Sequence, residues 1–254
     1  MLIVIFITFS ILILWSLLSF KIDKNIVYKP SKELLTKLKK FDIILFFSFF
    51  LIIMIFTIII SYSLNWVSES LIKLDENVIS FIKPTKVDWI CMSAIFSLSI
   101  SVSLIYSFTK YFLKDNFDIY WLYYNEKYKR FNINASLLLK YLSIIILIVS
   151  TINICLELDT YVIFKNKTIE INSYTELKSR EYPLDSLVKI VHYQKTIAPN
   201  GNIIEKPHYA IIFADGFQWK SIDNLRTPSN YDDELFNNLA QRANLKIEEI
   251  EIEK

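Results

Sequence analysis

Four long stretches with almost no charged residues dominate the first 155 residues of the chain. The run from Ile43 to Trp66 is the longest, with 24 residues and no Asp, Glu, Lys, Arg or His. At about 1.5 Å rise per residue, a helix of that length reaches roughly 36 Å and can cross a hydrocarbon layer of roughly 30 Å. No polar side is left for water, so the pattern favours a membrane-spanning helix over a soluble amphipathic one.

Three further runs have the same character but differ in strength. The run 2–20 is uncharged and is followed by Lys21 instead of a small-residue cleavage site, so we expect a retained helix and no signal peptide. The run 89–109 is also uncharged, whereas 137–156 is interrupted by Lys140, which would have to extend to the nearer membrane surface. The sequence therefore predicts a four-helix transmembrane region over residues 1–156, with spans at about 2–20, 43–66, 89–109 and 137–156.

The connections between these runs hold most of the charge in this part of the chain. Residues 31–40 begin with a suitable helix cap, Ser31, and are rich in lysine. We expect a positive loop here; a short basic helix at the lipid headgroups is the alternative. Apolar residues between Val67 and Ile82 recur with helical spacing and predict an amphipathic helix that ends at Pro84.

Two groups of side chains in and after the third run have more than one interpretation. The serines of 89–109 favour a helix–helix interface, because no ionisable residue joins them to form a polar translocation path. Tyrosine and tryptophan residues crowd the stretch 106–128 and predict a belt at the membrane–water boundary, with an aromatic ligand site as the alternative. The aromatic group comprises Tyr106, Tyr111, Tyr120, Trp121, Tyr123, Tyr124 and Tyr128.

The distribution of positive charge predicts an orientation. Twelve Lys and Arg residues lie in 21–42 and 110–136, whereas the connection 67–88 has three. The positive-inside rule then places the two basic connections in the cytoplasm. After four crossings the C-terminal part is non-cytoplasmic, but it is cytoplasmic if residues 137–156 do not cross.

The hydrophobic period changes near residue 157, where the sequence predicts a soluble domain over 157–254. Short β-branched and aromatic segments alternate with turn residues and predict roughly six strands, beginning with a hairpin around Asn166. Ser229 is a suitable cap for a following helix with one apolar stripe, which we expect to pack on the sheet. The tail from Lys246 alternates Ile and Glu, and is expected to be solvated or a short edge strand.

A turn with clear chemistry lies at residues 198–202, where Ala-Pro-Asn-Gly-Asn predicts a three-residue hairpin with a G1 bulge. This register makes Lys195 face Glu205, an opposite-charge pair that supports it. It also makes His192 face His208, and these are the only two histidines of the chain. Two ligands without a nearby cysteine are too few for zinc, so we expect an incidental cross-strand contact and no metal site.

The charge, cysteine and glycine content of the chain argues against several classes of function. The net charge is +2, but residues 156–254 carry 12 Lys and Arg against 16 Asp and Glu, and the positive excess lies in connections between apolar runs. A folded basic face is not indicated, so nucleic acid is not an expected partner. Cys91 and Cys155 lie in or beside apolar runs and are expected to be buried thiols, with a disulfide as the alternative. Two glycines are too few for a P-loop or a dinucleotide-binding fingerprint.

Three C-terminal segments carry a resemblance to a known family. They are 181–187 (Glu-Tyr-Pro-Leu-Asp-Ser-Leu) continuing to Ile190, the aromatic strand and Asp-Gly turn at 209–219, and the final helix. Together they resemble the bacterial pleckstrin-homology-like (PH-like) domains of small multi-span membrane proteins. The resemblance covers the last two-fifths of the chain. It implies a curved sheet barrel that is closed at one end by the helix and that recognises its partners through loops.

The predicted fold class is a membrane α + β protein, with a four-helix transmembrane region followed by a small PH-like β-barrel or sheet domain with one C-terminal helix. We expect an integral, multi-pass protein of the cell membrane that presents a binding module for non-enzymatic partner binding or complex assembly. Its expected partners are the lipid bilayer and a protein or peptide, and a homo-oligomer is an open alternative. A transporter or channel subunit, or an accessory protein, is the alternative function. No residue is assigned a catalytic, cofactor-binding or metal-binding role.

Overall fold

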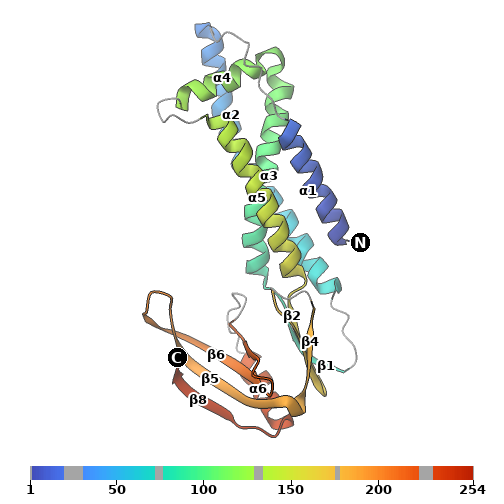
Figure 1. Ribbon diagram of the computed structural model, residues 1–254. Coiled ribbons are helices and arrows are strands. Elements are labelled where there is room, and N and C mark those ends of the chain that lie inside the picture. Colours follow the sequence, from blue (N-terminus) through green and yellow to red (C-terminus); the bar gives the residue numbers. More distant parts are fainter. Residues whose placement is uncertain are drawn as a thin grey trace. The chain divides into compact units, whose positions relative to one another are not determined.

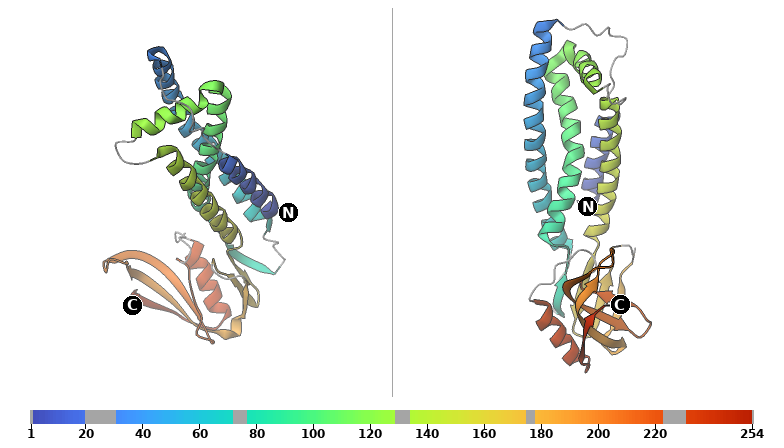
Figure 2. Two further views of the ribbon diagram at one scale, coloured as in Figure 1. Left: turned by 45° about the horizontal axis from the view of Figure 1, so that its top comes forward. Right: turned by 90° about the vertical axis from the view of Figure 1, so that its left-hand side faces the viewer.

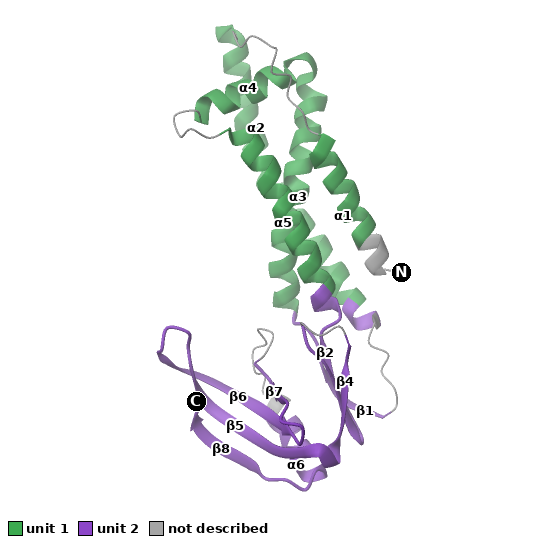
Figure 3. Ribbon diagram, in the orientation of Figure 1, with its two compact units in different colours: residues 1–67, 86–155 green, residues 68–85, 156–254 purple. Residues whose placement is uncertain are grey.

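The computed structural model describes residues 2–19, 31–71, 77–128, 134–174, 178–222 and 231–253. It is a mixed α/β protein in which a helical N-terminal part is followed by β-sheets and one C-terminal helix (Figure 1). The chain divides into two compact units, drawn in different colours in Figure 3. We name them the helical unit (Met1–Val67 with Lys86–Cys155) and the β unit (Ser68–Thr85 with Leu156–Lys254).

Within the described ranges, three helical stretches are long and apolar enough to cross a membrane. They are α2 (Lys32–Leu71), the stretch Lys86–Tyr128 that contains α3 (Lys86–Leu113) and α4 (Phe117–Tyr128), and α5 (Ala135–Leu158). Figure 2 shows α2, α3 and α5 lying lengthwise beside one another. The run 137–156, which the sequence supported least as a membrane span, thus lies in a helix of 24 residues, α5. The first run forms α1 (Leu2–Ser19), whose apolar stretch Ile7–Ser19 is shorter than the other three.

Helix α2 begins before the apolar run. Residues 32–40, predicted as a loop, are the first turns of this 40-residue helix, so that prediction is wrong. The Ser31 Oγ accepts a hydrogen bond from the Leu34 N–H at 3.2 Å, as a capping residue does. Lys37 pairs with Glu33 one turn earlier at 2.8 Å. Because leucine, lysine and glutamate favour helix and no glycine or proline intervenes, the helix continues into the apolar run.

Serines pack α3 against its neighbours. The Ser99 Oγ donates to the Ser143 carbonyl of α5 at 2.8 Å, and the Ser103 Oγ donates to the Ser16 Oγ of α1 at 2.8 Å. Others donate to carbonyls one turn back in α3 itself, as Ser97 does. The serines of α3 that have no exposed surface are Ser93, Ser97, Ser99 and Ser101. The predicted helix–helix interface is therefore confirmed.

One strand of the β unit comes from the connection between α2 and α3. Val78–Ile82 forms β1, which pairs antiparallel with β2 (Tyr161–Lys165). The amphipathic helix predicted over 67–82 is therefore wrong for the last five residues, while residues 72–76 lie outside the described part. The segment is β-branched and aromatic, and pairing with β2 satisfies its backbone groups, which outweighs the helical spacing.

The first sheet has four antiparallel strands in the order β1-β2-β3-β4. Strands β2 and β3 (Thr168–Asn172) form the predicted hairpin around Asn166, and β4 (Arg180–Pro183) follows at the edge. Alternate side chains of β2 and β3 face the core, as expected for strands with one buried face. These core residues are at most 2% exposed: Val162, Phe164, Ile169 and Ile171.

The second sheet has the order β7-β6-β5-β8. Its strands are β5 (Leu187–Ile197), β6 (Ile203–Phe213), β7 (Gln218–Lys220) and β8 (Ile247–Ile252). Lys195 faces Glu205 as predicted, and Gly201 (φ +82°) and Gly216 (φ +85°) take the left-handed conformation that their turns require. Strand β8 runs parallel to β5 at the edge of the sheet, which confirms the edge-strand alternative for the tail.

Helix α6 (Tyr231–Arg242) packs its apolar stripe on the core of the β unit. Phe236 is fully buried, and its ring lies 6.3 Å from that of Phe164 in the first sheet and 4.2 Å from that of Tyr209 in the second. Burying a side chain of this size contributes about 2–3 kcal/mol. The predicted stripe is therefore confirmed, while the predicted cap, Ser229, lies outside the described residues.

Candidate functional site

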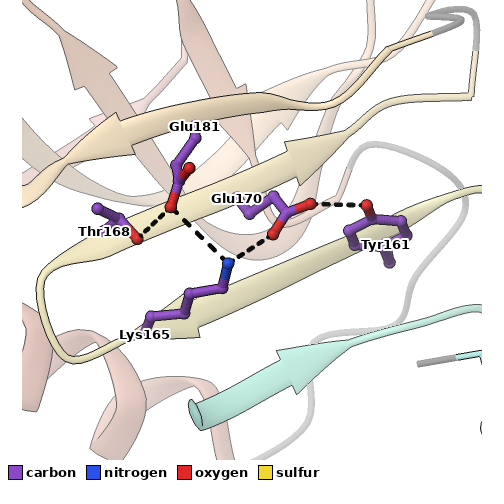
Figure 4. Close-up of polar contacts among 5 residues, drawn as sticks. All are labelled: Tyr161, Lys165, Thr168, Glu170 and Glu181. Atoms are coloured by element: carbon purple, nitrogen blue, oxygen red, sulfur yellow. Dashed lines mark hydrogen bonds and ion pairs between the residues drawn. The ribbon is translucent and has the colours of Figure 1, made fainter. Parts of the chain in front are cut away.

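Five side chains on one face of the first sheet form a polar network, drawn in Figure 4. They come from three adjacent strands: Tyr161 and Lys165 from β2, Thr168 and Glu170 from β3, and Glu181 from β4. Facing residues of neighbouring antiparallel strands lie about 4.5–5.5 Å apart on one face. The register of the sheet therefore brings these groups together although they are up to 20 positions apart in the sequence.

Lys165 lies between the two carboxylates of this network. Its Nζ is 2.7 Å from the Glu170 Oε2 and 3.7 Å from the Glu181 Oε1, and the Tyr161 hydroxyl donates to the Glu170 Oε1 at 2.8 Å. Burial acts to raise the pKa of Glu170, but the hydrogen bonds from Lys165 and Tyr161 outweigh it and lower that pKa. Burial, and then the bond to Glu170, raise the pKa of Tyr161 to about 12. At neutral pH Glu170 is therefore ionised and Tyr161 is protonated, so the network links strand β2 to strand β3.

The β5–β6 hairpin ends in exposed apolar side chains, which we name the hairpin tip: Ile197, Ile203 and Ile204. They are 49%, 57% and 41% exposed, and no charged residue lies between Lys195 and Glu205. Ile197 and Ile203 are cross-strand partners on one face of the hairpin, while Ile204 lies on the other. Single exposed apolar residues are ordinary, but a cluster on both faces of one hairpin indicates an interaction surface.

The two arms of this hairpin extend past the strands that flank them (Figures 1 and 2). On one side β8 ends beside Lys195, where the Glu253 N–H donates to the Lys195 carbonyl at 3.0 Å. On the other side β7 pairs only with residues 210–212 of β6. In the described part of the chain, no strand pairs with residues 203–208 on their outer side. Main-chain groups of residues 203–206 that face away from β5 can pair with a further strand, whereas Pro207 has no N–H to donate.

The two histidines do not face each other, so the predicted contact between them is wrong. His192 pairs with Tyr209, and His208 pairs with Tyr193, because the register shifts by one residue between Tyr193 and Lys195. Such a shift is a β-bulge, in which one strand contributes an extra residue. Counting pairs outward from the turn cannot show where the extra residue lies.

Each histidine instead lies beside a glutamate of the C-terminal strand region. The His192 Nδ1 is 2.9 Å from the Glu249 Oε2, and the His208 Nε2 is 3.2 Å from the Glu253 Oε2. The Nδ1–H of His208 donates to the Lys206 carbonyl at 2.9 Å. Nowhere in the described ranges does a group of three or more His, Cys, Asp or Glu side chains gather to hold a metal ion. His192 therefore helps to hold β8 against the sheet, while the His208 Nε2 lies near Glu253 without a hydrogen-bond partner among the described residues.

Most aromatic residues of the predicted belt gather at one end of the helical unit. The Trp121 ring is at the centre, 4.8 Å from that of Tyr106, 5.4 Å from that of Tyr120 and 5.6 Å from that of Tyr124. Tyr111, by contrast, is 73% exposed. The sequence indicated that aromatic residues are frequent in this stretch, but it could not show which rings are in contact. Those contacts depend on how α4 folds back toward α3.

These features define the class to which the chain belongs: a mixed α/β protein with three helices of membrane-spanning length and a separate two-sheet unit. No protein-family model, no curated protein and no solved structure matches the chain.

Proposed function

We propose that this chain is an integral membrane protein whose β unit is a PH-like module that binds a protein or peptide partner without catalysing a reaction. The spanning length of α2, α3 and α5 supports the membrane assignment. Two sheets packed on a single C-terminal helix support a PH-like module. The observation that carries the proposal is the hairpin tip, where three isoleucines are exposed beyond the flanking strands.

Addition of an extended strand is the binding mode that this surface favours. A peptide placed along residues 203–206, before Pro207, would form main-chain hydrogen bonds with the open edge, and its alternate side chains would contact Ile203 or Ile204. Residues 196–204 include no aromatic residue and no lysine or arginine, which surfaces that insert into lipid usually carry. A protein partner is therefore favoured over the bilayer itself.

We also infer that α2, α3 and α5 each cross the membrane, with α1 as a fourth crossing. Strand β1 lies in the connection between α2 and α3, and it pairs with β2, which directly follows α5. Paired strands lie on the same side of a bilayer, so if α3 crosses, α5 must cross back. The β unit is then on the side opposite the basic connections, which the positive-inside rule makes non-cytoplasmic.

Site-specific photo-crosslinking tests the partner proposal in intact cells. A photoreactive amino acid replaces Ile203 in the full chain, and Val188, a 58% exposed residue of β5 outside the hairpin tip, is the matched control position. We expect a protein adduct at position 203, none at 188, and loss of the adduct when Ile204→Lys is added. An unchanged amount of chain in the membrane fraction shows that the variant is still folded and inserted.

Several results would contradict the proposal. They are adducts of equal yield at both positions, adducts with lipid only, and an adduct of twice the chain's own mass, which would show self-association. Failure to crosslink any protein at position 203 would contradict it as well.

A further inference from the structure

The helical unit has a partly open cavity of about 320 Å³, lined in part by the aromatic residues around Trp121. This volume is at the lower end of the range of about 300–1,000 Å³ that is typical of small-molecule sites. Residues of α2, α3, α4 and α5 line it. Its polar lining includes Asp42, Tyr120 and Lys127, and its apolar lining includes Phe46, Phe49 and Phe50.

One negative and one positive side chain meet at the polar end of this cavity. The Asp42 Oδ1 accepts a hydrogen bond from the Tyr120 hydroxyl at 3.0 Å, and the Oδ2 accepts one from the Lys127 Nζ at 2.9 Å. The side chains of Asp42 and Lys127 are 23% and 43% exposed, so both remain accessible. A carboxylate has about four acceptor positions and an ammonium has three protons, so each can bind a further charged group.

The lining changes from charged to apolar within two turns of α2. Asp42 is the last charged residue before the uncharged run, and Phe46 and Phe49 follow it by four and seven positions. Residues at this spacing lie on the same side of a helix. Seven residues of helix span about 10 Å, so a ligand that fills the cavity needs a small polar head joined directly to an apolar chain.

We propose that this cavity binds a bilayer phospholipid with a phosphoethanolamine headgroup. The lipid ammonium would donate to Asp42, the lipid phosphate would accept from Lys127, and the start of an acyl chain would lie against Phe46 and Phe49. The site carries no net charge and has one group of each sign, which matches a headgroup that also carries one of each. An anionic glycerol headgroup would bring no cation to Asp42, and a choline headgroup has no N–H to donate to it.

Native mass spectrometry of the full chain tests this assignment. The purified protein is mixed with equal amounts of phosphatidylethanolamine, phosphatidylcholine and phosphatidylglycerol that have the same acyl chains. We expect one phosphatidylethanolamine to be retained per chain, at least about fivefold over either competitor. Asp42→Asn leaves a net positive site and should shift the preference to phosphatidylglycerol. Lys127→Met should abolish selective retention, while Lys110→Met, at an exposed lysine of α3 outside the cavity, should keep the wild-type preference.

The wild-type chain provides a second test that does not depend on the folding of a variant at the charged pair. Trp121 lines the cavity, so brominated phosphatidylethanolamine should quench its fluorescence more than brominated phosphatidylcholine does at the same mole fraction. Trp15 and Trp66 are also exposed on apolar helices and will be quenched by either lipid, so Trp121→Phe should remove only the difference between the two lipids. Retention without a headgroup preference, a wild-type preference for phosphatidylglycerol, or equal quenching by the two brominated lipids would overturn the proposal.

Discussion

Glu170 accepts hydrogen bonds from two residues of the neighbouring strand, and this makes it the residue on which the network of the first sheet depends. Replacing it by glutamine removes the charge that Lys165 contacts and weakens the bond from Tyr161. We expect Glu170→Gln to lower the free energy of unfolding of the full chain in detergent by about 1 kcal/mol at pH 7. Glu181→Gln is the control, because Glu181 is 57% exposed and 3.7 Å from the Lys165 Nζ, and its effect should be smaller.

This effect should depend on pH in a defined direction. The pKa of Glu170 is lower in the folded chain than its ordinary value of 4.5. Its stabilising contribution is therefore present above about pH 4.5 and is lost as the pH falls through the folded-state value. The difference between the melting curves of wild type and Glu170→Gln should shrink as the pH falls below 4.5, and a difference that stays constant or widens there would contradict this explanation.

Single positions also show where sequence reasoning succeeds and where it stops. The turn at 198–202 correctly set the pairing of Lys195 with Glu205, because turn type determines register near the turn. Only a few residues further on, a bulge moved His192 and His208 apart. The hairpin tip was missed as a site because its isoleucines look like ordinary strand residues until the lengths of the flanking strands are known.

Strand β1 illustrates the same limit for a whole element. Its five residues fit both a helical and a strand pattern, and its partner β2 begins about 80 positions later in the chain. The secondary structure of such short apolar segments is determined by their tertiary contacts more than by local propensity. The long elements were more predictable: the uncharged runs became helices, and the regular β5–β6 hairpin formed where its turn residues lie.

A pair of cysteines tests the pairing of β1 with β2. Phe81 faces Ile163 across the sheet, and facing Cα atoms of antiparallel strands are close enough for a disulfide. With both native cysteines replaced by alanine, we expect Phe81→Cys with Ile163→Cys to form a disulfide in the purified chain under mild oxidation. The bond should appear as a shift in gel mobility without reductant.

The matched control moves one cysteine by a single position. Ser80→Cys with Ile163→Cys places the two thiols on opposite faces of the sheet, because successive side chains of a strand alternate. It should remain reduced. Equal oxidation of both pairs would show that β1 does not hold the described register.

For the whole molecule, the orientation proposed above predicts which connections face the cell exterior. Asn200→Cys lies in the β5–β6 turn, and Asp115→Cys lies in the basic connection after α3; both positions are exposed. In a chain without native cysteines, a membrane-impermeant maleimide added to intact cells should label position 200 and not position 115. Labelling of position 115 alone would reverse the orientation, and labelling of both only after lysis would place the β unit in the cytoplasm.

The organisation of the molecule was predictable where it rests on composition. Long apolar runs predicted the helical part, and alternation of apolar and polar residues predicted the β-rich part. The two patterns differ because a helix in lipid is apolar on all sides, whereas a strand with one buried face alternates. The inclusion of residues 68–85 in the β unit was not predictable, since it depends on a contact between distant segments. The cavity beside Asp42 likewise needed the positions of four helices.

The early position of β1 has a consequence for biosynthesis. When this strand leaves the ribosome, its partner has not been made, and at about 5–20 residues per second the wait is about 4–16 s. Under the proposed topology, two apolar helices must be translated and inserted in that interval. Closure of the sheet then occurs only in molecules that have completed insertion, so a nascent chain that stalls keeps an unpaired strand that chaperones and proteases can detect.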